Sequence, residues 1–122
     1  MARVLIVDDQ HDIRELLRAI IEKEGHTCLL AGNAREAEAR LKEGADLMLL
    51  DVDMPGETGV ELLLRMRRGE VQPLVPTVFV TAYPERCGPL QATGHGAIKV
   101  IVKPFRLEEV RRILERLLTR AT

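Results

Sequence analysis

Several residues that could bind a cation or a phosphoryl group directly follow short apolar runs of this 122-residue sequence. They are Asp8 and Asp9 after VLIV, Asp51 after LMLL with Asp53 two residues later, Thr81 after TVFV, and Lys103 after VIV. Crowded carboxylates repel one another unless a cation compensates, and Mg²⁺ prefers oxygen ligands of this kind. An ionised Asp51 opposite the ammonium group of Lys103 could then act as the nucleophile toward a phosphoryl group. The residue types therefore indicate phosphoryl transfer onto an aspartate.

Each of these residues alone also has a purely structural explanation. Aspartate is common in helix caps and turns, and a threonine or lysine at such a position often does no more than end a strand. The chemical interpretation therefore depends on whether the fold brings these residues to the same place.

The apolar runs have the length of strands and alternate with segments of helical period. We expect strands at residues 4–7, 27–31, 47–50, 77–80 and 100–102. The helical segments have apolar residues at Ile13, Leu16, Leu17, Ile20 and Ile21, at Ala34, Ala37 and Leu41, and within residues 59–68 and 107–118. Parallel strands need crossover connections, so this alternation predicts a doubly wound α/β fold with five parallel strands. We expect residues 1–122 to form a single domain.

A doubly wound sheet binds ligands outside the carboxyl ends of its strands. All of the polar residues introduced above follow an expected strand at that end, so we expect them to converge on one edge of the sheet. This shared position favours a phosphoryl-transfer site over a set of unrelated caps and turns.

The fourth helical position is the weak part of the pattern. Residues 84–96, PERCGPLQATGHG, contain two prolines and three glycines, and both residue types disfavour a helix interior. We therefore predict a short or irregular fourth helix that begins near Pro89, because proline suits a first helical turn.

Composition argues against several other classes of protein. With 46% hydrophobic and 30% charged residues, the chain has the make-up of a globular domain rather than of a disordered or membrane protein. The opening residues, MARVLIVDD, hold too short an apolar run for a signal peptide or a membrane span, so we expect a cytoplasmic protein without membrane insertion. A net charge of −1 gives no basis for direct nucleic-acid binding. Cys28 and Cys87 form no metal-binding motif.

Four segments spread over nearly the whole chain carry a family resemblance: VLIVDD at 4–9, LLDVDMPGETG at 49–59, VTA at 80–82 and VKPF at 102–105. Together they resemble the receiver domain of two-component response regulators, and in particular the stand-alone, chemotaxis-regulator-like receivers. The resemblance implies a flavodoxin-like strand order 2-1-3-4-5. It also implies a signalling switch that catalyses only its own phosphorylation and dephosphorylation, rather than an enzyme that acts on other substrates.

The resemblance further implies how the phosphoryl group is taken up. Asp51 would be the phosphoacceptor, Thr81 and Lys103 would each contact a phosphoryl oxygen, and the bond between Lys103 and Pro104 would be cis. The donor would be the phosphohistidine of a histidine kinase or of a histidine phosphotransfer protein. The output would pass to a protein target that the sequence does not identify.

A metal site is implied by the same resemblance. Asp9, Asp51 and the main-chain carbonyl of Asp53 would bind Mg²⁺, with Mn²⁺ as an alternative ion. Asp8 would bind this ion directly or support it through a water molecule.

The sequence departs from the family pattern at one position that matters for signalling. Family members commonly have Tyr or Phe three residues before the lysine, where the ring moves together with the hydroxyl at the Thr81 position. Val100 stands there, so the usual aromatic readout cannot operate. Tyr83 is the nearby aromatic residue. Our hypothesis is that Tyr83 and Asp53 set the lifetime of the aspartyl phosphate, Tyr83 by screening water and Asp53 by its charge near the attacking water.

Two other functions remain as alternatives. A degenerate receiver would act as a phosphorylation-independent interaction module, and Val100 and the proline-rich fourth helical segment favour it. A phosphohydrolase of the haloacid-dehalogenase type would use DVDMP as its DxD motif. In that group the nucleophile usually follows the first strand and the acidic pair comes late in the chain. Here the acidic pair, Asp8 and Asp9, comes first, so the order of the motifs argues against this group.

Overall fold

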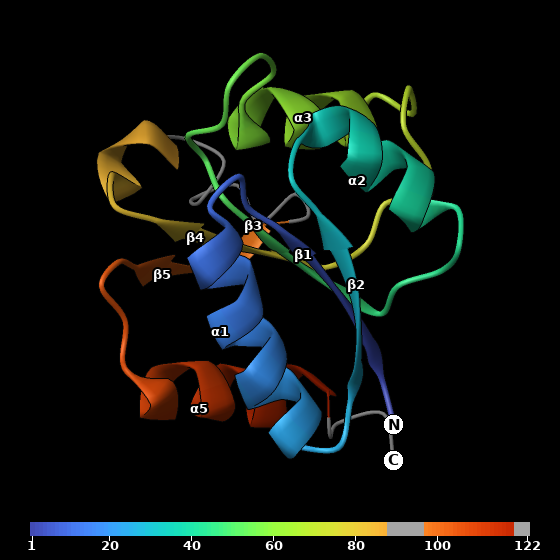
Figure 1. The fold of residues 1–122 in the computed structure, drawn as a ribbon. Helices are drawn as coiled ribbons and strands as arrows, with labels where there is room; N and C mark the ends of the chain where they lie inside the picture. The colour runs from blue at the N-terminus through green and yellow to red at the C-terminus, as the bar shows by residue number, and fades with distance from the viewer. Residues whose placement is uncertain (88–96, 119–122) are drawn as a thin grey trace.

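Five parallel strands form one sheet in the computed structural model, which describes residues 1–87 and 97–118 (Figure 1). The strands are β1 (Arg3–Val7), β2 (Thr27–Ala31), β3 (Leu47–Leu50), β4 (Thr77–Thr81) and β5 (Ala97–Val102). The helices are α1 (His11–Lys23), α2 (Ala34–Leu41), α3 (Gly59–Arg67) and α5 (Leu107–Leu118), with a short 3₁₀ helix, η1 (Pro84–Cys87). The strand order β2-β1-β3-β4-β5 confirms the predicted doubly wound topology.

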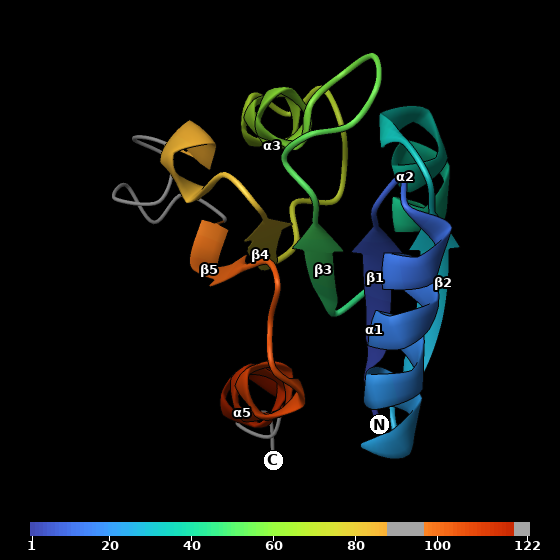
Figure 2. The same ribbon diagram turned by 60° about the vertical axis from the view of Figure 1, so that its left-hand side comes forward.

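Helices cover both faces of the sheet. α2 and α3 lie on one face and α1 and α5 on the other, as the two ribbon views show (Figures 1 and 2). Successive side chains of a strand point to opposite faces. Accordingly, Leu5 and Val7 of β1 belong to the core cluster under α2 and α3, whereas Val4 and Ile6 belong to the cluster under α1 and α5. This two-sided burial explains why the strands read as unbroken apolar runs.

The described part of the fourth helical segment is a single 3₁₀ turn, η1. This agrees with the prediction of a short or irregular element. The predicted start near Pro89 falls within 88–96, outside the described residues.

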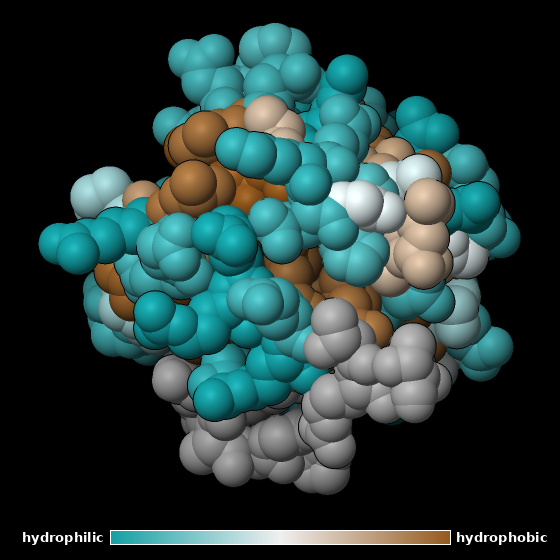
Figure 3. Space-filling view, turned by 90° about the horizontal axis from the view of Figure 1, so that it is seen from below, coloured by the Kyte–Doolittle hydropathy of each residue, from teal (hydrophilic) through white to brown (hydrophobic). Residues whose placement is uncertain are grey.

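Hydrophilic residues dominate the face on the side of α5. Viewed from below, this face shows hydrophobic residues only as separate patches among hydrophilic ones (Figure 3). Within the described parts of the chain, no helix combines the length and apolar character needed to cross a bilayer.

The start of α3 is fixed against the end of β3. Thr58 Oγ1 accepts a hydrogen bond from the Glu61 amide (3.1 Å), and the Glu61 carboxylate accepts one from the Thr58 amide (2.8 Å), which forms a capping box. The next residue, Gly59, donates its amide to the Val52 carbonyl at 2.9 Å. A Cβ atom on Gly59 would lie 2.2 Å from the main-chain oxygen of Asp51. Glycine is therefore required where α3 meets the backbone of Asp51.

Gly59→Ala is expected to lower the free energy of unfolding by about 2–3 kcal/mol, because its methyl group would overlap main-chain atoms. Helix propensity acts in the opposite direction, since alanine normally favours a helix by about 1 kcal/mol over glycine. Chemical denaturation measures the difference. Gly25→Ala is the control, because its Cβ meets nothing within 4 Å and only its φ of +92° is unfavourable. A Gly59→Ala protein no less stable than the Gly25→Ala protein would contradict the steric explanation.

Candidate functional site

The strand order places two aspartates side by side at the end of the sheet. β1 lies between β2 and β3, and Val7 is in register with Leu50. The Asp8 amide donates to the Ala31 carbonyl at 3.0 Å, and the Asp51 amide donates to the Val7 carbonyl at 2.9 Å. These hydrogen bonds continue the parallel pairing one residue beyond the strands. Asp8 and Asp51 therefore leave the sheet from adjacent and rigidly held positions.

Asp8, Asp9 and Asp51 form an acidic cluster. Each offers one carboxylate oxygen, and these oxygens all lie within 4.8 Å of one another. Asp8 and Asp51 are only 1% and 4% exposed, whereas Asp9 is exposed. Mg²⁺ takes a small number of carboxylate oxygens and keeps several waters. A cluster of close oxygen donors that opens to solvent on one side fits this ion.

Lys103 approaches the acidic cluster from near the other end of the chain. Its amide donates to the Thr81 carbonyl (2.8 Å), and its peptide bond to Pro104 is cis, as the family resemblance implied. Its ammonium nitrogen lies 2.9 Å from Asp8 Oδ2 and 3.8 Å from Asp51 Oδ1. The cation is thus hydrogen-bonded to one buried carboxylate and within ion-pair distance of the other.

Burial and the neighbouring negative charge make Asp51 difficult to ionise. Burial is the largest cause and the Asp8 carboxylate the next, and together they raise the pKa of Asp51 from 3.8 to about 7, although Lys103 acts in the opposite direction. A divalent cation on the acidic cluster would offset both causes and favour the ionised carboxylate. The cluster therefore needs more positive charge than Lys103 supplies.

The turns after β3 and β4 are held by hydrogen bonds of the site residues. The Asp53 amide donates to Asp51 Oδ1 at 3.2 Å. Thr81 is fully buried at the end of β4, and its hydroxyl accepts a hydrogen bond from the Tyr83 amide at 2.9 Å. Thr81 therefore stands at the carboxyl edge beside β3, as expected, with its hydroxyl oxygen oriented by the turn that follows.

Arg86 joins Asp53 to Tyr83, a contact that was not predicted from the sequence. Arg86 Nη1 donates to Asp53 Oδ1, and the guanidinium carbon lies 4.3 Å from the centroid of the Tyr83 ring. Arg86 and Asp53 are 33 residues apart. The tertiary arrangement of the turns after β3 and β4 brings Arg86 and Asp53 together. Their separation in the sequence therefore could not predict this ion pair.

Gln10 and Arg14 hold Asp8 in place. Neither residue was predicted from the sequence to belong to the site. The Gln10 amide donates to Asp8 Oδ1 (2.9 Å), and its side-chain oxygen accepts from the Lys103 ammonium group (3.2 Å). Arg14 Nη1 donates to the main-chain oxygen of Asp8 at 2.6 Å. The position of Gln10 directly after the aspartate pair was an available signal.

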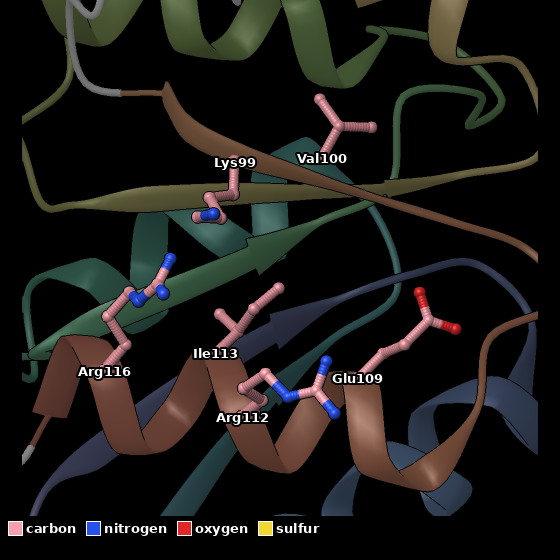
Figure 4. A pocket seen from close by; sticks show the side chains of 6 residues that line it. All are labelled: Lys99, Val100, Glu109, Arg112, Ile113 and Arg116. Carbon is pink, nitrogen blue, oxygen red and sulfur yellow. The ribbon is translucent and has the colours of Figure 1, made fainter.

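The Val100 side chain lies on the face of the sheet covered by α2 and α3 and points away from α5. It is half-buried, is in register with Phe79 of β4, and packs against the core cluster under α2 and α3. Figure 4 shows Val100 and Lys99 pointing in opposite directions from β5, with Lys99 directed toward α5. The pocket between β5 and α5 is lined by Lys99, Val100, Glu109, Arg112, Ile113 and Arg116 (Figure 4).

Asp51→Asn is expected to raise the free energy of unfolding by about 2–4 kcal/mol at pH 8 in EDTA, because it removes a buried charge. The folded protein keeps a proton on Asp51 that the unfolded chain releases between about pH 4 and pH 7, so wild-type stability falls as pH rises through this window. The advantage of the variant should therefore be small near pH 4. Denaturation at both pH values measures it.

The control for this comparison is Asp46→Asn, since Asp46 lies outside the acidic cluster. It should bring no gain in stability. An Asp51→Asn protein without a larger gain at pH 8 than at pH 4 would contradict the raised pKa of Asp51.

Comparison with known proteins identifies the family of this domain. Residues 4–115 match the response regulator receiver domain. The chain is 37% identical over 110 residues to sporulation initiation phosphotransferase F of Bacillus subtilis, which covers 89% of this chain and 87% of that protein. It is 38% identical over 108 residues to the phosphate regulon transcriptional regulatory protein PhoB of Pseudomonas aeruginosa, which covers 88% of this chain and 47% of that protein. This chain therefore spans about half the length of such a regulator.

Solved structures agree with this relationship. The response regulator TrrA from Thermotoga maritima, in complex with Mg²⁺ and BeF, has a TM-score of 0.83 and 33% identity, and the match covers 97% of this chain and all of TrrA (100%). The chemotaxis protein CheY4 from Vibrio cholerae has a TM-score of 0.82 and 31% identity, with 97% and 99% of the two chains covered. By its sequence, its strand order and the acidic cluster at the end of the sheet, this chain belongs to the receiver domains of two-component response regulators.

Proposed function

We propose that this receiver accepts a phosphoryl group on Asp51 from a phosphohistidine and signals through the resulting change in the site. The observation that carries the proposal is the geometry around Asp51. Its buried carboxylate lies in a cluster with Asp8 and Asp9, and the Lys103 ammonium group is 3.8 Å away. These parts are sufficient for phosphoryl transfer, which depends mainly on positioning and on stabilisation of charge.

In the transfer step, an oxygen of the Asp51 carboxylate attacks phosphorus. A new bond forms between this oxygen and phosphorus, while the bond between phosphorus and the donor's imidazole nitrogen breaks and its electron pair stays with the imidazole. Lys103 moves from Asp8 toward an oxygen of the transferred group. The Thr81 hydroxyl donates to another oxygen, since a hydroxyl can accept from the Tyr83 amide and donate at the same time.

Asp8, Asp9, Asp51 and the main-chain carbonyl of Asp53 would hold the metal ion. Mg²⁺ supplies positive charge that neutralises phosphoryl oxygens and the carboxylates, and Mn²⁺ suits the same oxygen donors. The residues of the chain keep these donors in place, with Asp8 fixed by Gln10 and Asp51 by the adjacent strand.

Loss of the phosphoryl group completes the cycle. Water attacks phosphorus, the bond to the Asp51 oxygen breaks, and inorganic phosphate leaves. The domain thereby catalyses a reaction of its own side chain and regulates other proteins, rather than turning over a separate substrate. Asp53 and Tyr83 stand beside the site and would set the rate of this step.

A histidine kinase or a histidine phosphotransfer protein would be the donor, and the reaction would take place in the cytoplasm. Leu16 on α1 is a hydrophobic side chain with 49% exposure that could contact the donor. Residues 1–122 would act as one receiver domain. Family membership leaves the dehalogenase alternative without support, whereas Val100 keeps a phosphorylation-independent interaction module as the second candidate.

The first test is the intact mass of the protein after incubation with acetyl phosphate. Wild type should gain one phosphoryl group in Mg²⁺ and none in EDTA, and Asp51→Asn should gain none, because the variant lacks the nucleophile. Asp46→Asn serves as the matched control and should gain the group. Wild type that gains nothing from acetyl phosphate or from a phosphohistidine donor would contradict the proposal and favour the interaction module.

The second test concerns the lifetime of the aspartyl phosphate. Tyr83→Ala should hydrolyse about threefold to tenfold faster than wild type, because removal of the ring opens the site to water; this corresponds to about 0.7–1.4 kcal/mol. Asp53→Asn should also change the rate, because it removes the negative charge near the attacking water. The rate is measured as loss of the phosphoryl mass after removal of the donor.

Leu74→Ala is the control for this test, since Leu74 is 50% exposed and Tyr83 is 46% exposed. It should leave the rate unchanged. If Tyr83→Ala and Asp53→Asn both decay at the wild-type rate, neither residue sets the lifetime.

A further inference from the structure

Arg86 bridges the two turns that border the phosphorylation site. On one side its Nη1 atom donates to Asp53 Oδ1, and on the other its guanidinium group lies over the Tyr83 ring, 4.3 Å from the centroid. Asp53 belongs to the turn after β3 and Tyr83 to the turn after β4. The Arg86 side chain thus links the segments that carry Asp51 and Thr81.

Both partners of Arg86 are tied directly to the reacting groups. The Asp53 amide donates to Asp51 Oδ1 at 3.2 Å, and the Tyr83 amide donates to the Thr81 hydroxyl at 2.9 Å. The backbone of Arg86 is also held in place, because its amide donates at 2.9 Å to the carbonyl of Tyr83, the residue before η1. A chain of contacts therefore runs from Asp51 through Asp53, Arg86 and Tyr83 to Thr81.

Arg86 is the hydrogen-bond partner that holds the Asp53 carboxylate in position. Among the described residues, no hydrogen-bond partner contacts its second oxygen, Oδ2, which is buried. The Arg86 side chain is 55% exposed, so this is an ion pair at the surface rather than in the core. Its contribution to overall stability should be small, and its effect should lie in where it holds Asp53 and Tyr83.

We propose that Arg86 is a positioning residue for the hydrolysis of the aspartyl phosphate. It holds the Asp53 carboxylate and the Tyr83 ring together over one side of the site and thereby limits access of water to phosphorus. The inference rests on the proposed phosphorylation of Asp51. It adds that Asp53 and Tyr83 act as a coupled pair, joined by an arginine that does not itself touch the phosphoryl group.

The test compares the decay of the aspartyl phosphate in wild type, Arg86→Ala, Tyr83→Ala and the double variant, each phosphorylated with acetyl phosphate and Mg²⁺. Arg86→Ala should decay about threefold to tenfold faster, the range that a cation–π contact and an exposed ion pair support. The double variant should decay more slowly than the product of the two single effects predicts, because Arg86 acts in part by holding the Tyr83 ring. Arg86→Lys, which keeps the charge, should recover part of the wild-type lifetime.

Arg68→Ala is the matched control. Arg68 also forms an exposed ion pair, with Glu70 at 2.6 Å and with a side chain that is 58% exposed, but it lies beyond the end of α3. It should leave the decay unchanged, and thermal unfolding should show similar stability for both alanine variants.

The outcomes separate this inference from the proposed function. Wild type that takes up a phosphoryl group and an Arg86→Ala protein that decays at the wild-type rate would overturn the role of Arg86 alone. Fully additive effects of Arg86→Ala and Tyr83→Ala would overturn the coupling. No phosphoryl gain on wild type from any donor would overturn both the proposed function and the role of Arg86.

Discussion

Burial of two carboxylates beside a single lysine is the constraint on which the rest of the site depends. Asp8 and Asp51 are 1% and 4% exposed, and the Lys103 side chain, 13% exposed, contacts both. With Asp9 in the same cluster, the negative charges outnumber this positive charge. Buried charge without compensation is costly. The site therefore carries excess negative charge, which a divalent cation on the acidic cluster would neutralise. The added positive charge would also favour binding of an anionic phosphoryl group.

This excess of negative charge persists only if the backbone cannot relax. β1 and β3 are interior strands, and the amides of Asp8 and Asp51 remain bonded to the neighbouring strands. Gly59 lets α3 approach the Asp51 carbonyl so closely that no side chain fits between them. The apolar clusters on both faces of the sheet supply the stability. Function at the strand ends thus depends on stability that these apolar clusters supply and that the buried Asp51 carboxylate lowers when it is ionised.

The strands and their polar ends were predictable because both signals are local. Unbroken apolar runs mark buried parallel strands, and the crossover rule then brings Asp8, Asp51 and Lys103 to one edge. The partners of these residues were not predictable in the same way. That Lys103 contacts Asp8 more closely than Asp51, and that Arg86 reaches Asp53, depends on side-chain positions set by tertiary structure. For the fourth helical segment, only a short or irregular helix could be predicted. Its prolines and glycines disfavour a regular helix but do not indicate which structure replaces it.

The Thr81 hydroxyl connects the acidic site to the turn after β4 through its hydrogen bonds. Its hydroxyl accepts from the Tyr83 amide and still has a proton to donate to a phosphoryl oxygen. A shift of this hydroxyl would therefore move the Tyr83 backbone, whose carbonyl in turn accepts from the Arg86 amide in η1. Val100 is aliphatic and packs against the core cluster, so it offers no ring to follow such a shift. Among the described residues, the hydrogen bonds from the Thr81 hydroxyl thus lead to the turn that holds Tyr83 and η1 rather than to a side chain on β5.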